Sequence, residues 1–191
     1  MRHCAEGTGT FSRRDDQWCG GQPGLIVSGS GATITSQDGT SYLDCSMGLG
    51  SVSLGHGDDH LSTHVARIVR EGTTFSRSVP EEEALAELVS RAIPGCQLLR
   101  FLGSGSDATE AAIRLARAHT GRDRIVTMGY HGWHDSLINR TSFHVRHHGV
   151  PSCLLDLVDR APASMDALEL ITDRTAAVIL EPMPATKPTL H

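Results

Sequence analysis

The stretch Arg100-Phe-Leu-Gly-Ser-Gly-Ser-Asp-Ala-Thr-Glu110 decides the fold expected for this chain. Apolar residues from Leu98 to Leu102 predict a strand, and the alternating glycine and serine of Gly103 to Ser106 predict a tight turn. Helix-forming residues follow from Asp107 to His119, with Ser106 or Asp107 as the expected N-cap. The stretch therefore predicts a strand–turn–helix unit, the building block of an α/β fold.

The same turn has the features of a phosphate-binding site. The unpaired N–H groups in the first turn of a helix carry partial positive charge, and glycine lets a ligand approach them closely. The side chains of Ser104 and Ser106 add hydroxyl donors. Two alternatives stay open at this point. A capped turn can bind nothing, and Gly103-x-Gly105-x-x-Ala108 also satisfies the fingerprint of an NAD(P)-binding Rossmann domain, although the next strand ends without the expected carboxylate.

The segments beyond the turn alternate between strand and helix patterns. Arg124 to Met128 and Ala176 to Leu180 predict strands, and Met165 to Ile171 predicts a helix. A further helix is expected from Pro80 to about Ala92, because proline suits the first helical position and three glutamates follow it. This alternation indicates a largely parallel sheet covered by helices.

The sequence before residue 80 predicts a smaller unit. Apolar runs at Leu25–Val27, Ala32–Thr35 and Tyr42–Cys45 predict a β-meander, with Asp38-Gly39 as a hairpin turn. A helix capped by Asp58 or Asp59 is expected next. The expected organisation is a loose lead-in over residues 1–23, the meander and helix over residues 24–79, and the α/β domain over residues 80–191.

Composition narrows the class of protein. A net charge of −5 and the lack of a Lys/Arg run argue against partners such as nucleic acid or a membrane surface. The N-terminal sequence lacks the apolar core of a signal peptide, and the apolar run Ala176–Leu180 is far too short to cross a bilayer, so a cytoplasmic protein is expected. The five cysteines form no CxxC pair and indicate neither a disulfide framework nor a zinc site.

The eleven histidines raise a metal-enzyme alternative. His56, His60 and His64 are spaced to share a helix face, and His131-x₂-His134-Asp135 starts a second group. Neither spacing matches a catalytic pattern such as HExxH, so solvated or capping histidines are the simpler account and no metal is expected. The second group also contains His144, His147 and His148.

Several short motifs occur in one order and spacing from about Gly24 to Pro182. They are Asp38-Gly39, Tyr42-Leu43-Asp44, Leu54-Gly55-His56, Glu83 to Leu88, Ser104 to Ala112, Arg114 to Arg117, Thr120 to Asp123, Tyr130 to Asp135 and Ala176 to Pro182. As an ordered set they resemble the N-terminal portion of class III pyridoxal-phosphate-dependent aminotransferases, closest to the glutamate-1-semialdehyde 2,1-aminomutase-like branch.

The resemblance implies the large domain of a fold-type I, aspartate aminotransferase-like transferase, and the cofactor pyridoxal 5'-phosphate (PLP). Gly105 and Ser106 would hold the cofactor phosphate through a main-chain N–H and a hydroxyl group. Tyr130 would stack on the pyridine ring, His131 would shape the substrate side, and Glu181 would lie near the ring. The expected cofactor-binding residues are Ser104, Gly105, Ser106, Tyr130, His131 and Glu181.

The resemblance extends to the substrate side. Met47–Ser51 and Thr74–Ser76 match segments that line the substrate pocket, partly across the interface of a homodimer. Gly103 stands where the family usually has Asn, and Asp107 where it usually has Glu; both are small changes in the cofactor turn, which bear on the affinity for the cofactor rather than on the identity of the family.

The basic residues bear on catalysis. PLP chemistry needs a lysine bonded to the cofactor and an acid beside the pyridine nitrogen, and in the family both follow the motif that ends at Pro182. Sixteen of the seventeen basic residues are arginine, and the one lysine, Lys187, lies between prolines where it is not expected to serve. We therefore expect a truncated large domain without its Schiff-base lysine, hence with no catalytic residue and no activity alone.

The function implied by the resemblance is amino-group transfer, by a transaminase or an aminomutase, on a small amino acid or amino-aldehyde. One alternative is a non-catalytic fragment or subunit that pairs with a second, completing polypeptide, since unfilled sheet edges favour pairing. The NAD(P)-binding domain is a further alternative.

Overall fold

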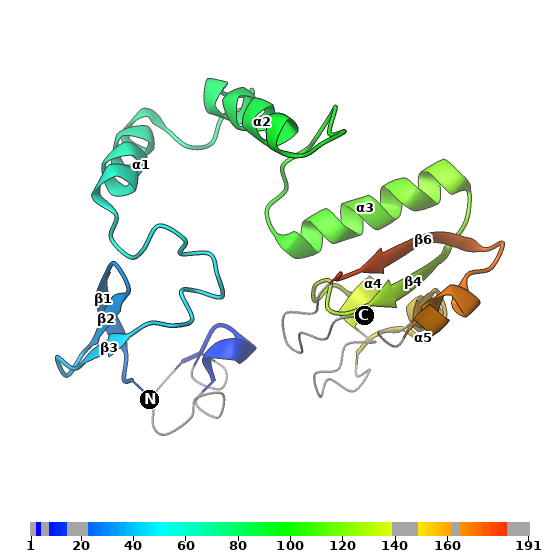
Figure 1. Cartoon of the computed structure of the whole chain (residues 1–191), viewed down its shortest axis with the longest axis horizontal. Coiled ribbons are helices and arrows are strands. Elements are labelled where there is room, and N and C mark those ends of the chain that lie inside the picture. Colours follow the sequence, from blue (N-terminus) through cyan, green and yellow to red (C-terminus); the bar gives the residue numbers. More distant parts are fainter. Residues whose placement is uncertain (1–2, 5–7, 15–22, 139–148, 162–164, 183–191) are drawn as a thin grey trace. The chain divides into compact units, whose positions relative to one another are not determined.

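The computed structural model describes residues 3–4, 8–14, 23–138, 149–161 and 165–182. The chain divides into two compact units, Met1–Pro80 and Glu81–His191 (Figure 1). A short 3-10 helix, η2 (Phe11–Arg13), precedes the first sheet. None of the described helices combines the length and apolar character needed to cross a membrane.

The first unit contains the predicted β-meander. Strands β1 (Ile26–Ser30), β2 (Thr33–Ser36) and β3 (Ser41–Leu43) pair antiparallel in the order β1-β2-β3. The predicted turn at Asp38-Gly39 is confirmed: Gly39 has φ +88°, and an Asp38 carboxylate oxygen accepts from the Thr40 N–H at 3.0 Å and from the Ser36 hydroxyl. These hydrogen bonds, that from Ser36 foremost, lower the pKa of Asp38.

An Asp44–His56 pair fastens the loop after β3 to the meander. His56 Nε2 lies 2.8 Å from Asp44 Oδ2, and the main chains of His56 and Gly31 exchange two hydrogen bonds of 2.8 Å. The other Asp44 oxygen accepts from the Ser46 and Met47 N–H groups at 2.9 Å. The hydrogen bond from His56, followed by that from Met47, lowers the pKa of Asp44.

We predict that this pair makes stability depend on pH on the acid side. Because the folded-state pKa of Asp44 is lowered, its contribution is present above the ordinary carboxyl pKa and is lost as the pH falls through the folded value. Asp44→Asn should therefore lower the urea midpoint at pH 7 and change it progressively less toward pH 3, as circular dichroism would show. The exposed Asp173→Asn is the control, and a deficit for Asp44→Asn that stays constant with pH would contradict the prediction.

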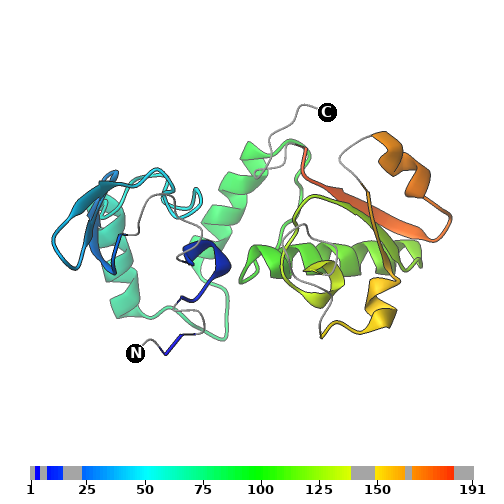
Figure 2. The same ribbon diagram turned by 90° about the horizontal axis from the view of Figure 1, so that it is seen from below.

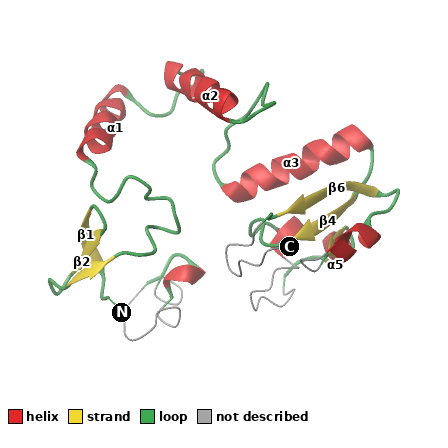
Figure 3. Cartoon of the chain, in the orientation of Figure 1, coloured by secondary structure: helices red, strands yellow, loops and turns green. Residues whose placement is uncertain are grey.

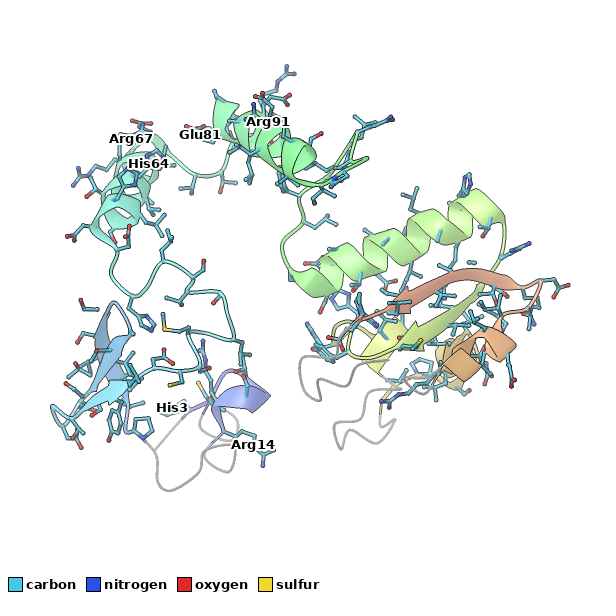
Figure 4. All side chains as sticks on the ribbon, viewed as in Figure 1. His3, Arg14, His64, Arg67, Glu81 and Arg91 are labelled. Atoms are coloured by element: carbon cyan, nitrogen blue, oxygen red, sulfur yellow. The ribbon has the colours of Figure 1, made fainter. Side chains whose placement is uncertain are left out.

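The two helices that follow begin where the sequence predicts. α1 (Asp59–Glu71) has Asp58 as N-cap, whose carboxylate accepts from the Leu61 N–H at 2.8 Å. α2 (Pro80–Ala92) has three glutamates in its first turn and Arg91 in its last, as the helix dipole favours (Figure 4). Within the described chain neither helix has a buried residue. Their large exposed apolar residues are Leu61, Val65, Val69, Leu85 and Leu88.

The second unit contains a parallel three-stranded sheet in the order β5-β4-β6. Figure 3 shows β4 and β6 side by side. β4 (Arg124–Met128) lies between β5 (Val158–Arg160) and β6 (Thr175–Leu180). Helix α3 (Gly105–Thr120) lies along one face, and the 3-10 helix η4 (Met165–Leu170) packs on the other, as Figures 1 and 2 show. Two short helices complete the unit, α4 (Asp135–Ile138) and α5 (Ser152–Leu155).

The core forms on both faces of β4 because successive residues of a strand point to opposite sides. Ile125 is fully buried and belongs to a cluster with Ile113 of α3 and Leu137 of α4. The next residue, Val126, is also fully buried but packs toward Leu170 of η4. The central strand thus holds α3 in a fixed position, and the site lies at the N-terminal end of that helix.

Three predictions of secondary structure are wrong. Leu98–Leu102 is not a strand: no described segment pairs with it, and Leu98 is 95% exposed. A strand needs a hydrogen-bonded neighbour, and both edges of β4 are already occupied by β5 and β6. Helix α3 starts at Gly105 with Ser104, rather than Ser106 or Asp107, as its N-cap. The predicted helix at Met165–Ile171 is a 3-10 helix, Met165–Leu170.

Candidate functional site

The N-terminus of α3 presents two main-chain N–H groups for a ligand. Ser104 has extended backbone angles, and its hydroxyl accepts from the Asp107 N–H at 3.2 Å, while its carbonyl accepts from the Ala108 N–H at 3.0 Å. Among the described residues, no acceptor is bonded to the N–H of Gly105 or Ser106. The two groups lie at the positive end of a sixteen-residue helix, the position that favours an anion.

The space beside Gly105 is open, whereas Ser106 is largely covered on the side of a neighbouring loop. A Cβ atom built on Gly105 would meet no atom within 4 Å. Ser106 is 9% exposed, and a Cβ atom built on Gly132 would come within 2.6 Å of its hydroxyl oxygen. A ligand therefore has room beside Gly105, and the loop that contains Gly132 bounds the site on the other side.

That loop is the turn Gly129–Trp133, which follows β4 and is bonded to α3 at two points. The Trp133 N–H donates to the Ser106 hydroxyl at 3.2 Å, and the Thr109 hydroxyl lies 2.7 Å from the His131 carbonyl and 3.0 Å from that of Ser106. A serine hydroxyl that accepts from Trp133 keeps its own hydrogen for donation. Ser106 can thus hold the turn and donate to an anion at once.

The same turn is bonded to β6 through Glu181. The Glu181 N–H donates to the Met128 carbonyl at 3.2 Å, and its carboxylate accepts from the Tyr130 N–H at 3.1 Å. Gly129 has φ +90°, and a Cβ atom there would collide with the Glu181 carboxylate. Tyr130 is therefore attached by its main chain to the residue that follows β6, and the residue as a whole is 45% exposed.

The imidazole of His131 is held by a contact within the turn. Its Nε2 atom lies 2.6 Å from the Met128 carbonyl oxygen. A carbonyl oxygen only accepts, so Nε2 is the donating nitrogen of this contact and Nδ1 is the ring nitrogen left to face other groups. The half-buried imidazole is thereby fixed in orientation.

A carboxylate lies close to the candidate anion site. Asp107 Oδ2 accepts from the Ser104 hydroxyl at 2.7 Å, and Asp107 Oδ1 lies 3.6 Å from His134 Nε2. The negative charge of Asp107 stabilises the helix N-terminus but repels an incoming anion. A protonated His134 would offset that repulsion.

The structure brings most of the predicted site residues together. Ser104, Gly105 and Ser106 form the start of α3, and the turn that carries Tyr130 and His131 is bonded to Ser106 on one side and to Glu181 on the other. Sequence reasoning missed Thr109, whose contact with His131 spans 22 residues and leaves no local pattern. Lys187 lies outside the described residues, as do His144, His147 and His148.

Two further candidate segments belong to the other compact unit of the chain. Met47–Ser51 and Thr74–Ser76 belong to the first unit. The first of these segments is strained, since Met47 to Gly50 have successive φ values of +46°, +60°, +58° and +87° and two of the four residues are not glycine. His56 is paired with Asp44. Over the residues that the structure describes, no three His, Cys, Asp or Glu side chains are grouped to hold a metal ion.

We predict that Gly105→Ala separates anion binding from folding. The added methyl group meets no protein atom, and alanine suits a helix better than glycine, so the thermal midpoint should be unchanged or slightly raised. The methyl group would, however, obstruct an anion at the Gly105 and Ser106 N–H groups and should weaken phosphate binding roughly tenfold. Phosphorus NMR titration with inorganic phosphate measures this effect.

Gly132→Ala is the matched comparison, because its methyl group would meet Ser106 and its φ is +119°. It should lower the thermal midpoint clearly. Equal phosphate affinity in the wild type and in Gly105→Ala would show that the anion does not bind at this helix end.

Comparisons with known proteins show the family to which the chain belongs. The family model for aminotransferase class-III matches residues 20–187. The glutamate-1-semialdehyde 2,1-aminomutase of Haloquadratum walsbyi is 38% identical over 174 residues, which cover 84% of this chain and 39% of that protein.

Solved structures agree as well. A glutamate-1-semialdehyde aminomutase from Pseudomonas aeruginosa PAO1 superposes with a TM-score of 0.78 at 25% identity, covering 98% of this chain and 44% of that one. A transaminase solved with PLP bound gives a TM-score of 0.76 at 29% identity, covering 85% of this chain and 41% of that one. The chain thus spans about two fifths of the length of the relatives it matches.

Proposed function

Because the chain belongs to the class-III aminotransferase family, we propose that it forms the phosphate-binding side of a PLP site. The observation that carries the proposal is the pair of N–H groups on Gly105 and Ser106, which have no acceptor among the described residues and lie at the positive end of α3. A phosphate ester is the anion that this arrangement suits, since several oxygens can accept from neighbouring donors at once.

The residues present fit such a group. The N–H groups of Gly105 and Ser106 and the hydroxyl hydrogen of Ser106 would donate to the phosphate, and the open space beside Gly105 would admit it. The Ser104 hydroxyl donates its hydrogen to Asp107, so this side chain would have to rotate before it could donate to the phosphate. Bound PLP would supply the electron sink that amino-group chemistry needs.

The turn after β4 supports the second part of the site. We propose that the Tyr130 ring stacks on the cofactor ring, because its main chain is bonded to Glu181 and the loop around it is bonded to α3. His131, with Nε2 donating to Met128, would present Nδ1 as a proton acceptor on the substrate side. Glu181 would lie next to this part of the site.

The activity we propose for the complete enzyme is amino-group transfer on a small amino acid or amino-aldehyde, by a transaminase or an aminomutase. Relatives with both names support this breadth. A cytoplasmic homodimer is the proposed setting. Pairing with a second, completing polypeptide is also proposed, because apolar side chains at Leu98 and along β6, Val178 and Leu180, are exposed.

The test compares pyridoxamine 5'-phosphate with pyridoxamine on the full chain. These amines cannot form an imine with Lys187, so they report the phosphate site without covalent trapping by a stray lysine. The phosphorylated ligand should bind at least about tenfold more tightly, and inorganic phosphate should compete with it. Equilibrium dialysis measures both affinities.

Equal affinity for the two amines would contradict the proposal. NADH serves as the second ligand in the same assay. Binding of NADH in place of pyridoxamine 5'-phosphate would favour a dinucleotide site at the same helix end.

A further inference from the structure

We infer that Glu181 is a positioning residue, which acts on the cofactor site through the main chain of Tyr130 and does not itself contact the cofactor. The effect of Glu181 on cofactor binding rests on the proposed function. The hydrogen bond between Glu181 and Tyr130 is observed independently of that function. The geometry of β6, of Gly129 and of the opposite end of the turn supports this assignment.

Glu181 holds both ends of the Met128–Tyr130 segment. Its N–H donates to the Met128 carbonyl at 3.2 Å, which extends the parallel pairing of β4 with β6 by one step. Its side chain then reaches the Tyr130 N–H, 3.1 Å from the carboxylate. An N–H bonded to a charged acceptor is held more firmly than one bonded to a neutral group, so the direction of the chain at Tyr130 is set from β6.

Gly129 and the Glu181 carboxylate are matched to each other. The φ of +90° at Gly129 turns the chain sharply out of β4, in a region that residues with side chains rarely adopt. A Cβ atom at this position would occupy the space that the Glu181 carboxylate fills. The absence of a side chain at residue 129 is therefore what lets Glu181 reach the N–H of Tyr130.

The far end of the turn is held independently by α3. Ser106 accepts from the Trp133 N–H, and the Thr109 hydroxyl reaches the His131 carbonyl. Tyr130 therefore lies in a segment whose main chain is fixed from β6 before it and from α3 after it. These main-chain contacts would set the orientation of the Tyr130 ring. Removing the Glu181 side chain would leave the turn bonded to α3 alone at its far end.

Hydrogen exchange of individual amides tests the contact without any ligand. Glu181→Ala should speed the exchange of the Tyr130 N–H at least about tenfold, whereas Glu181→Gln, which keeps an accepting oxygen, should restore most of the protection. The Trp133 N–H, bonded to Ser106, should change much less and serves as the internal reference. Glu169→Ala, an exposed glutamate of η4, is the control variant.

Gly129→Ala keeps the test decisive if Glu181→Ala fails to fold. The added methyl group should displace the carboxylate and speed the exchange of the Tyr130 N–H although Glu181 is still present. Unchanged exchange at Tyr130 in both variants would overturn the inference, and so would equal acceleration at Tyr130 and Trp133.

A double-mutant cycle with pyridoxamine 5'-phosphate then separates positioning from direct contact. If Glu181 acts through Tyr130, Glu181→Ala should weaken binding several-fold in the wild type and hardly at all in Tyr130→Ala. Additive losses in the cycle, with no rescue by Glu181→Gln, would instead assign Glu181 to the cofactor. Failure of the wild type to bind this ligand would refute the proposed function, while the amide-exchange result would still decide the role of Glu181 in the turn.

Discussion

The site depends on one constraint of helix geometry: the first N–H groups of α3 have no carbonyl before them to bond to. Ser104 satisfies the N–H of Asp107, which leaves those of Gly105 and Ser106 for a ligand. Burial of Ile113 against Ile125 fixes the helix on the sheet and therefore fixes the place where these groups point. The packing of the core and the anion binding that we propose at the helix end both depend on this one helix.

The turn after β4 forms a second wall beside the proposed anion site. The main chain of this five-residue turn, Gly129–Trp133, is hydrogen-bonded to Ser106 of α3 and to Glu181 at the end of β6. The turn therefore connects β4, α3 and β6. A hydroxyl that accepts from one side and donates to the other lets Ser106 serve the fold and the ligand together. The turn requires glycine at residues 129 and 132. Both have positive φ values, and a side chain at Gly129 would meet Glu181, while one at Gly132 would meet Ser106.

Local pattern was enough to predict much of this arrangement and not enough for the rest. The bounds of α2 and β4 follow from residues within each segment. In α2 the signal is a proline followed by glutamates, and in β4 it is a run of β-branched residues. Leu98–Leu102 has the composition of a buried strand but lacks a described partner, since pairing depends on distant segments. The three residues of β5 are too few to show a period. Ser104 and Ser106 are equally good caps by type, and the hydrogen bond from the Asp107 N–H to the Ser104 hydroxyl identifies Ser104 as the cap.

The most direct test of the account is the response of the Gly105 and Ser106 amide resonances when pyridoxamine 5'-phosphate is added to the isotope-labelled chain. Hydrogen bonds to a phosphate should shift both amide protons downfield by more than any other amide of α3, and pyridoxamine without the phosphate should leave them in place. Shifts confined to other parts of the chain, with these two resonances unmoved at saturation, would contradict the claim that the start of α3 receives the cofactor phosphate.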